Sequence, residues 1–380
     1  MSKMIICIDI TSIPYGTGVS NYTLNLVRNL VRINKNNTYK LFFSSFRLPI
    51  PPEITELKKY PNVKIYRYCL PISLLEFFWN RLHIFPIELF VGKCDVFHTS
   101  DWTQPPTIRA KTITTIHDLA PFLFPQWQHP LIIETHTRKL KLAVKNCRKF
   151  ISVSQNTKND LLKLFPEINP HKISVIYEAA EDKYDKFSKL SSELQKRKTD
   201  VIHRQYGLNK FILAQGTREP RKNLTKLIEA FNIFKKNNPK NIVELAVAGK
   251  YGWGEDVIHL KNPSIKILGY IPEKDMVALH ASALCLAYPS QYEGFGLPIV
   301  KSMKVGTPVI AGNTSSLPEV CGPAAILIDP NDVNDIAKAI ENIIKSPNLR
   351  RSLTKKGYKQ AAKFSWDQTA QDTLTVYQSM

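Results

Sequence analysis

Several patterns that mark particular protein classes are missing from this chain of 380 residues. Its six cysteines include no CxxC pair and no Cys/His spacing typical of zinc, which predicts reduced thiols in a cytoplasmic protein. No apolar run approaches the roughly 20 residues that are needed to span a bilayer. The short apolar stretch at the start ends at Asp9, so it predicts a first strand rather than a signal peptide. We therefore expect a globular protein of the cytoplasm.

Other signatures are absent too. The GxGxxG fingerprint of standard dinucleotide-binding proteins does not occur, and neither do short-period repeats, low-complexity tracts or familiar RNA-binding patterns. Hydrophobic residues make up 43% and charged residues 22%, as in an ordinary globular protein. The length is too great for one ordinary core and indicates two domains.

What the chain does have is a strong positive charge, with a formal net charge of +20 and a pI near 9.6. Such a charge favours nucleic acid or an anionic membrane surface as a partner. Arg138, Lys141, Lys145 and Arg148 recur at helical spacing and form a basic stripe. This stripe has two interpretations, a solvated lysine-rich face or a peripheral contact with the inner membrane surface. Because RNA-binding patterns are absent, we predict no nucleic-acid partner.

Short apolar runs alternate with helical periodicity along the whole chain, which predicts α/β layers with parallel sheets. The strands predicted in the first half are Met4–Ile10, Tyr39–Ser44, Val63–Tyr68, Val96–His98, Thr112–Ile116, Lys149–Val153 and Ile173–Ile176. Those predicted in the second half are Phe211–Gln215, Val243–Ala248, Ile265–Leu268, Leu284–Tyr288, Pro308–Ala311 and Ala325–Ile328.

The two series of strands predict two Rossmann-like, doubly wound domains that face a cleft, with ligands at the carboxyl ends of the strands. We assign residues 1–185 to the N-terminal domain and residues 207–364 to the C-terminal domain. Residues 186–206 are rich in charge and carry no strand signal, which predicts a linker.

The most informative segment runs from Tyr288 to Lys301 and has the sequence YPSQYEGFGLPIVK. Here Glu293 is followed by glycines on both sides of Phe295 and then by Pro298, which suits the first turn of a helix. Backbone N–H groups at a helix start, with the positive end of its dipole, bind anions. Amides for phosphate beside a carboxylate for hydroxyl groups are what a nucleotide sugar requires.

A second segment, from Gly216 to Asn223, follows the first strand of the C-terminal half. Its Arg221 can make a forked contact with a diphosphate, and its Lys222 supplies a point charge. Exposed cations are usually only solvated, but the Glu293 segment in the same half favours a donor site. The backbone of residues 268–271, which ends another strand, is either a surface loop or an edge that contacts a nucleobase.

The first half offers two further candidates at its strand ends. A loop with Gly16 and Gly18 lies between the first strand and a helix that starts near Ser20. It is either an ordinary tight turn or a loop that approaches phosphate. His117 ends another strand, where a histidine serves either a structural role or a contact with a sugar hydroxyl or phosphate oxygen.

Taken together, these residues resemble the retaining glycosyltransferases of the GT-B class that share an E-x7-E motif, glycosyltransferase family 4. The resemblance covers essentially the whole chain and is most specific at EGFGLP (293–298), GTREPRKN (216–223), IHDL (116–119) and SSLPEV (315–320). The PRKN part is most similar to bacterial mannosyltransferases that build surface polysaccharides from GDP-mannose.

The resemblance implies roles for individual residues. Arg221 and Lys222 would hold the donor diphosphate, Glu293 the hydroxyls of the donor sugar, and His117 would contact that sugar; these four are the catalytic candidates. The remaining residues that we predict at the donor site are Gly16, Gly18, Arg218, Gly269, Tyr270, Ile271, Gly294, Phe295, Gly296, Leu297 and Lys301. The family also implies that the last helix, residues 365–380, packs back onto the N-terminal domain.

One position departs from the family, because Lys301 stands where the second glutamate of the E-x7-E motif is expected. That glutamate normally pairs with ribose hydroxyls, and a lysine there can donate to ribose or phosphate instead. Alternatively, the substitution leaves a catalytically impaired scaffold or partner subunit with the same fold. A sugar-nucleotide epimerase is a further alternative, but the EGFGLP segment favours transfer.

The resemblance predicts a metal-independent, retaining hexosyltransferase with no cofactor. It would move a hexose, with mannose favoured, from a nucleotide-diphosphate sugar to a glycan or lipid-linked acceptor. Electrostatic stabilisation of the leaving diphosphate by Arg221 and Lys222 would be central to catalysis. Replacing both cations with alanine is therefore expected to abolish transfer and to leave the fold intact.

Overall fold

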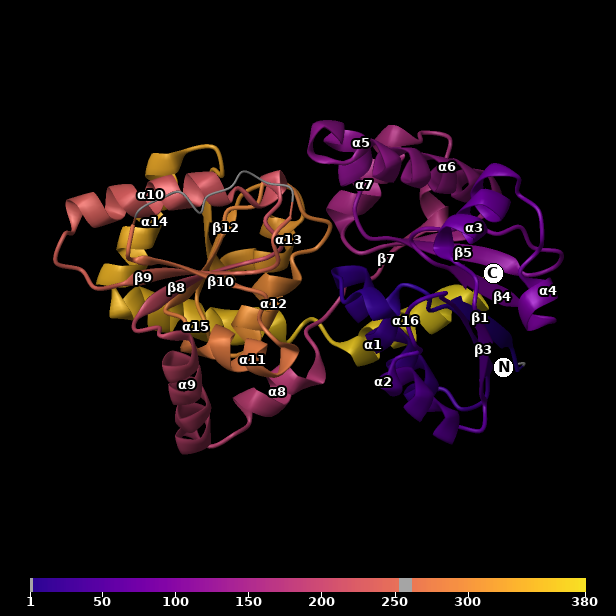
Figure 1. Ribbon diagram of the computed structural model, residues 1–380, viewed down its shortest axis with the longest axis horizontal. Coiled ribbons are helices and arrows are strands. Elements are labelled where there is room, and N and C mark those ends of the chain that lie inside the picture. The colour runs from indigo at the N-terminus through magenta and orange to yellow at the C-terminus, as the bar shows by residue number, and fades with distance from the viewer. Residues whose placement is uncertain (1–2, 253–261) are drawn as a thin grey trace. The chain divides into compact units, whose positions relative to one another are not determined.

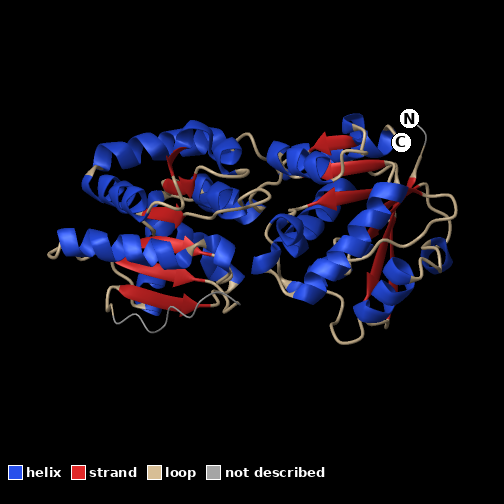
Figure 2. Ribbon diagram, turned by 90° about the horizontal axis from the view of Figure 1, so that it is seen from above, coloured by secondary structure: helices blue, strands red, loops and turns tan. Residues whose placement is uncertain are grey.

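The computed structural model describes residues 3–252 and 262–380, and these residues form two compact units. The first unit comprises residues 1–178 together with the C-terminal segment 365–380, and the second comprises residues 179–364. Each unit contains a parallel sheet with α-helices packed along it, drawn as red arrows and blue coils in Figure 2. The predicted fold class, two Rossmann-like domains, is confirmed.

The first unit is built on a seven-stranded parallel sheet in the order β3-β2-β1-β4-β5-β6-β7. Its strands are β1 (Ile5–Asp9), β2 (Thr38–Ser44), β3 (Val63–Tyr68), β4 (Val96–Thr99), β5 (Lys111–Ile116), β6 (Lys149–Ser152) and β7 (Ile173–Val175). Its helices are α1 (Gly18–Ile33), α2 (Pro52–Thr55), α3 (Ile72–Glu76), α4 (Glu88–Val91), α5 (Ala120–Leu123), α6 (Pro130–Asn146), α7 (Gln155–Leu164) and α16 (Trp366–Gln378).

The second unit contains a six-stranded parallel sheet in the order β10-β9-β8-β11-β12-β13. Its strands are β8 (Phe211–Gln215), β9 (Glu244–Ala248), β10 (Ile265–Gly269), β11 (Cys285–Tyr288), β12 (Val309–Gly312) and β13 (Ala325–Ile328). Its helices are α8 (Asp182–Ser188), α9 (Ser192–Tyr206), α10 (Leu224–Asn237), α11 (Glu273–Ser282), α12 (Leu297–Lys304), α13 (Leu317–Cys321), α14 (Val333–Lys345) and α15 (Pro347–Ala361).

All strands predicted from the apolar runs are present, with bounds that differ by one residue at some ends. They are recognisable because strands of a parallel sheet are covered on both faces and therefore form continuous apolar runs. In the second unit, α10 lies along one side of the sheet and α11 along the other (Figure 1). The apolar stripe of α10, including Leu227, Phe231 and Phe234, is buried against the sheet as its period predicts.

The strand order reverses at one point in each sheet, between β1 and β4 in the first unit and between β8 and β11 in the second. Neighbouring connections leave such a point in opposite directions, so the loops that follow the two central strands diverge and leave room for a ligand. In the second unit these are the loops that contain Arg221 and Glu293.

The C-terminal helix α16 belongs to the first unit, as predicted. Its Tyr377 hydroxyl lies 2.7 Å from Nδ1 of His98 at the end of β4, and the Thr369 hydroxyl donates to the Tyr177 carbonyl at 2.7 Å. Burial lowers the pKa of His98 to about 3, so this histidine is a neutral hydrogen-bonding group that anchors the helix.

Residues 186–206, predicted as a linker, instead comprise the end of α8 and the whole of α9. The side chain of Ser191 accepts from the Leu194 amide at the start of α9, and Gly207 ends this helix in the left-handed conformation. Only Ile202 of this helix is buried, so its sequence is nearly all polar and is similar in composition to a linker. The boundary between the units falls at 178/179, directly after β7.

The basic stripe on α6 is only partly exposed. Lys141 and Lys145 face solvent, whereas Arg138 forms ion pairs with Glu76 and Glu134. Lys139 is buried, and its Nζ donates to the Thr114 hydroxyl at 2.7 Å. The six cysteines are all free thiols. Within residues 3–252 and 262–380, every helix is too short or too polar to cross a membrane.

Candidate active site

The loop after β8 presents three cations at the carboxyl edge of the second sheet. It makes a tight turn at Gly216, whose φ of 141° is a conformation that side chains with a Cβ rarely adopt. Gly249, at the end of β9, packs so closely here that a Cβ on it would lie 1.8 Å from the Gly216 carbonyl oxygen. After this glycine contact the chain continues through Arg218 to a short 3-10 turn, η6 (Pro220–Lys222), which contains Arg221 and Lys222.

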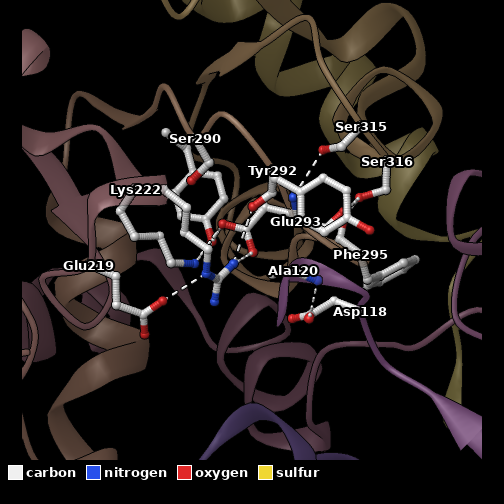
Figure 3. Close-up of polar contacts among 12 residues, drawn as sticks. Asp118, Ala120, Glu219, Lys222, Ser290, Tyr292, Glu293, Phe295, Ser315 and Ser316 are labelled. Atoms are coloured by element: carbon white, nitrogen blue, oxygen red, sulfur yellow. Dashed lines mark hydrogen bonds and ion pairs between the residues drawn. The ribbon is translucent and has the colours of Figure 1, made fainter. Parts of the chain in front are cut away.

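Both cations of η6 bind the carboxylate of Glu293, which lies in the loop after β11 (Figure 3). Arg221 Nη1 donates to Glu293 Oε2 at 2.7 Å, and Lys222 Nζ donates to Oε1 at 2.6 Å. The Tyr288 hydroxyl also donates to Oε1, at 2.8 Å. Glu219 holds Arg221 from the other side, through a 2.7 Å contact with Nε. The residues that were predicted to grip a diphosphate and a sugar therefore form a single buried cluster.

The charges in this cluster fix its protonation state. Burial alone would raise the pKa of the Glu293 carboxyl, but Arg221 and Lys222 outweigh it and lower that pKa to about 2. Burial and the neighbouring Arg221 lower the pKa of Lys222, an effect that Glu293 opposes. The contribution of Glu293 to stability is thus present above its ordinary pKa of 4.5 and is lost as the pH falls toward 2.

The loop from Gly294 to Leu297 joins Glu293 to the start of α12. Gly296 caps this helix with a φ of 109°, and a Cβ on it would meet the Leu317 side chain at 3.0 Å. The Ser316 hydroxyl donates to the carbonyls of Glu293 and Phe295, both at 2.9 Å, and the Phe295 ring packs edge-on against Phe364. Pro298 has no N–H and the Ile299 amide donates to the Gly296 carbonyl at 3.0 Å, so the phosphate contact predicted for this segment rests on the amides of residues 295–297.

Arg218 lines a small cavity between β8 and β11, together with Gly216, Lys222 and Tyr288. Its guanidinium lies 4.6 Å from the centre of the Tyr251 ring. Its Nε and Nη1 are buried without a hydrogen-bond partner among the described residues. A buried guanidinium that lacks acceptors favours an anion, so this cavity is a natural extension of the cluster.

The segment Gly269–Ile271 follows β10 at the same edge of the sheet. The Gly249 amide donates to the Gly269 carbonyl at 2.8 Å, which ties this segment to the end of β9. Tyr270 is exposed with Lys250 near its ring, whereas Ile271 is buried. Their contact with a donor remains a prediction.

Lys301 has a partner that the sequence did not suggest. Its Nζ donates to Oε1 of Glu181, immediately before α8, at 2.9 Å. The side chains are only 7% and 12% exposed, and the Tyr184 ring lies 5.6 Å from the ammonium. Lys301 and the nearby carboxylate form a buried ion pair between α12 and the start of α8, while the predicted donor contact of Lys301 stays a prediction.

The three remaining candidates belong to the first unit. Gly16 ends the short 3-10 turn η1 (Ile13–Tyr15) with a φ of 64°, and Gly18 is the first residue of α1. Between them, Thr17 caps α1 in a reciprocal capping box with Ser20. The space around both glycines is open, since a Cβ on either would meet no atom within 4 Å.

His117 follows β5 and pairs with Glu178 at 3.3 Å, while its ring packs edge-on against Tyr22. Burial lowers the pKa of His117, but the Glu178 carboxylate, helped by Asp101 and Asp118, outweighs burial and raises the pKa above 6.5. The ion pair thus stabilises the fold fully below pH 6.5, and its contribution is lost as the pH rises through the raised pKa.

We expect His117→Gln to lower the free energy of unfolding by about 1–3 kcal/mol at about pH 5.5, and by less at about pH 8.5. Urea unfolding of both proteins across this range measures the difference. Glu178→Gln should remove the same pH-dependent part, since it deletes the other partner. A stability difference that does not change with pH would contradict a charged pair.

Within the described part of the chain, no group of three or more His, Cys, Asp or Glu side chains is arranged to hold a metal ion. The predicted independence from metal and from other cofactors is a separate matter that only an assay can test.

Comparisons with known proteins agree with this architecture. Residues 16–184 match the family model for Glycosyltransferase Family 4, and residues 195–360 match the model for Glycosyl transferases group 1. O-antigen chain mannosyltransferase B of Escherichia coli is 28% identical over 95% of this chain and 96% of that protein. O-antigen chain mannosyltransferase RfbU of Salmonella typhimurium is 27% identical over 75% and 71%.

Among solved structures, Anabaena HepE in complex with UDP and glucose superposes with a TM-score of 0.70 at 17% identity, covering 99% of this chain and 100% of that one. This likeness shows the shared GT-B fold. Because the two family models together match nearly all of both units, the chain is a glycosyltransferase that belongs to family 4.

Proposed function

We propose that this glycosyltransferase moves mannose from GDP-mannose to a glycan or lipid-linked acceptor during surface polysaccharide assembly. The two relatives described above carry the name mannosyltransferase, and one of them matches this chain over nearly its whole length. The observation that carries the proposal is the convergence of Arg221, Lys222 and Glu293 at the reversal point of the second sheet.

In this proposal the two cations and the amides of residues 295–297 stabilise the charge of the diphosphate as the bond to the sugar breaks. Charge that develops in a buried, preorganised site is stabilised more strongly than in water. Glu293 sets the positions of both cations and accepts hydrogen bonds from sugar hydroxyls. The sugar keeps its anomeric configuration, because the departing phosphate takes the acceptor proton on the same face that the acceptor attacks.

A panel of nucleotide sugars in a thermal unfolding assay tests the donor. Saturation at about 100 times the dissociation constant adds about 2.7 kcal/mol of stability, so the true donor should raise the melting temperature by several degrees. GDP-mannose is expected to give the largest shift, and UDP-sugars and GDP-glucose smaller ones. A larger shift with another sugar would reject mannose, and no shift with any donor would favour the alternative of an inactive scaffold.

The same donor, supplied with membrane extract as the source of acceptor, tests the remaining parts of the proposal. Transfer should continue at an unchanged rate after treatment with EDTA, because Arg221 and Lys222 supply the positive charge. Proton NMR of the product should show the anomeric configuration of the donor. A rate that falls with EDTA and recovers with a divalent cation would show a metal requirement.

We further propose that the protein works in the cytoplasm, in peripheral contact with an anionic inner membrane surface. The charge of +20 and the exposed Lys141 and Lys145 support this contact. Sedimentation with vesicles of neutral or mixed anionic lipid tests it, and equal binding to both would remove the electrostatic argument.

A further inference from the structure

The second unit contains a groove that plays no part in the site described above. It lies between α8, α9 and α11, which are neighbours along one side of this unit (Figure 1). Its volume is about 530 Å³, which falls in the range of about 300–1,000 Å³ that is typical of small-molecule sites. None of the residues that line it belongs to the Arg221–Glu293 cluster.

The inside of the groove is apolar. Phe187 from α8, Ile202 from α9, and Val277 and Ala278 from α11 form its buried surface. Val201 of α9 extends this surface outward and is 46% exposed. The groove exists because α9 is a polar helix that buries only Ile202, so three helices enclose a space that their side chains do not fill.

The rim of the groove carries a net positive charge, because four lysines lie there against two carboxylates. Its two acidic side chains are already engaged: Glu273 pairs with Lys183, and Asp275 accepts hydrogen bonds from Gln205 and Tyr206. Three further lysines of the rim, Lys186, Lys198 and Lys274, are exposed and have no carboxylate partner within the described residues. The groove thus combines an apolar interior with three available ammonium groups.

We propose that this groove binds an anionic lipid, with an acyl chain along the apolar interior and the phosphate headgroup on the lysines of the rim. An apolar ligand without charge would leave the lysines unused, and an inorganic anion would gain nothing from the interior. Only an amphiphile that is both apolar and anionic satisfies both features. The groove shares no residue with the Arg221–Glu293 cluster, so this proposal and the proposed mannosyl transfer are tested separately.

One side of the groove lies between the two family-model matches. The match to the first model ends at residue 184, and the match to the second begins at residue 195. Lys186 and Phe187 of α8, and Leu190 just after it, fall between them, whereas the residues of the groove on α9 and α11 lie within the second match.

Three soluble probes separate the contributions of chain and charge. Calorimetric titration with dodecyl phosphate, below its micelle concentration, should give saturable binding. Dodecyl maltoside, which has the same chain without the charge, should bind at least about tenfold more weakly, and inorganic phosphate should not saturate. If inorganic phosphate bound as well as dodecyl phosphate, the groove would be an anion site and not a lipid site.

Charge reversal on the rim tests the location. Lys186→Glu, Lys198→Glu and Lys274→Glu together should weaken dodecyl phosphate at least about tenfold, and should lower binding to vesicles that contain phosphatidylglycerol. The matched control reverses three exposed lysines, Lys236 near the end of α10, Lys240 in the turn after it and Lys338 on α14, and gives the same net charge. If both triple variants lost binding equally, net charge and not the groove would be responsible, and the proposal would fail.

Val201→Asp tests the apolar part, because it places a carboxylate in the exposed wall of the groove. It should weaken both dodecyl maltoside and dodecyl phosphate, the latter more because the carboxylate also repels the phosphate, and it should not change nucleotide binding at the Arg221–Glu293 cluster. The nucleotide readout also shows that each variant is folded. Unchanged affinity for both amphiphiles in Val201→Asp would overturn the placement of the acyl chain.

Discussion

Replacing Arg221 and Lys222 together with alanine is expected to lower the free energy of unfolding by about 3–5 kcal/mol, as well as to abolish transfer. The sequence alone predicts that this double variant keeps its fold, because cations after a strand look like ligand-binding residues on a surface. The structure gives a different expectation. Both cations bind the buried Glu293 carboxylate, so their removal leaves a charge in the interior without its partners.

A third substitution separates stability from function. Adding Glu293→Gln to the double variant removes the stranded charge and should recover most of the lost stability, while transfer stays absent. Without Arg221 and Lys222, burial raises the pKa of Glu293, so this carboxyl takes up a proton in mildly acidic solution. The stability difference between the double variant and the wild type should therefore shrink as the pH falls below about 5. Urea unfolding of the three proteins at two pH values measures both effects. A double variant that is as stable as the wild type would show that the cluster does not hold Glu293 as described.

The fold was predictable because its signals are local. A parallel strand covered on both faces must be apolar along its length, and the period of a helix such as α10 records which side is buried. The loops that contain Arg221 and Glu293 were also predictable, since each follows a central strand of the sheet. Their direct contact was not predictable, because nothing in either segment specifies a distance of 2.7 Å across 72 residues.

The sequence does not specify which distant residue a charged side chain will meet. Lys301 and Glu181 are 120 residues apart, and no pattern in either segment indicates that they meet. Lys139, which lies beside the basic stripe in the sequence, is buried, and its Nζ donates to the Thr114 hydroxyl. The helix α9 was taken for a linker, because a helix that buries one residue has no periodic apolar signal. In each case tertiary packing, rather than local sequence, decides the environment of a charge.

The buried pair of Lys301 and Glu181 leads to the second large expected effect. Lys301→Glu would restore the second glutamate of the E-x7-E motif, and from the motif alone it should improve donor binding. The structure instead predicts a loss of stability, because the new carboxylate would face the carboxylate of Glu181, to which Lys301 Nζ now donates at 2.9 Å. Two buried like charges should lower the free energy of unfolding by at least about 3–5 kcal/mol. The loss should shrink at acid pH, because one of the two carboxyls would have a raised pKa and take up a proton.

The exchange of both charges, Lys301→Glu with Glu181→Lys, should restore much of the stability that either single substitution loses, and a double-mutant cycle in urea measures this coupling. A matched control lies one turn further along α12, where Lys304 pairs with Asp185 of α8 at the same distance of 2.9 Å. Asp185 is 43% exposed, so Lys304→Glu should change stability by no more than about 1 kcal/mol. If Lys301→Glu proved as mild as this control and bound donor more tightly, Lys301 would be a substitution in the donor site. If Lys301→Glu unfolds the protein and the charge exchange rescues it, Lys301 is a structural residue that stabilises the fold through its ion pair with Glu181.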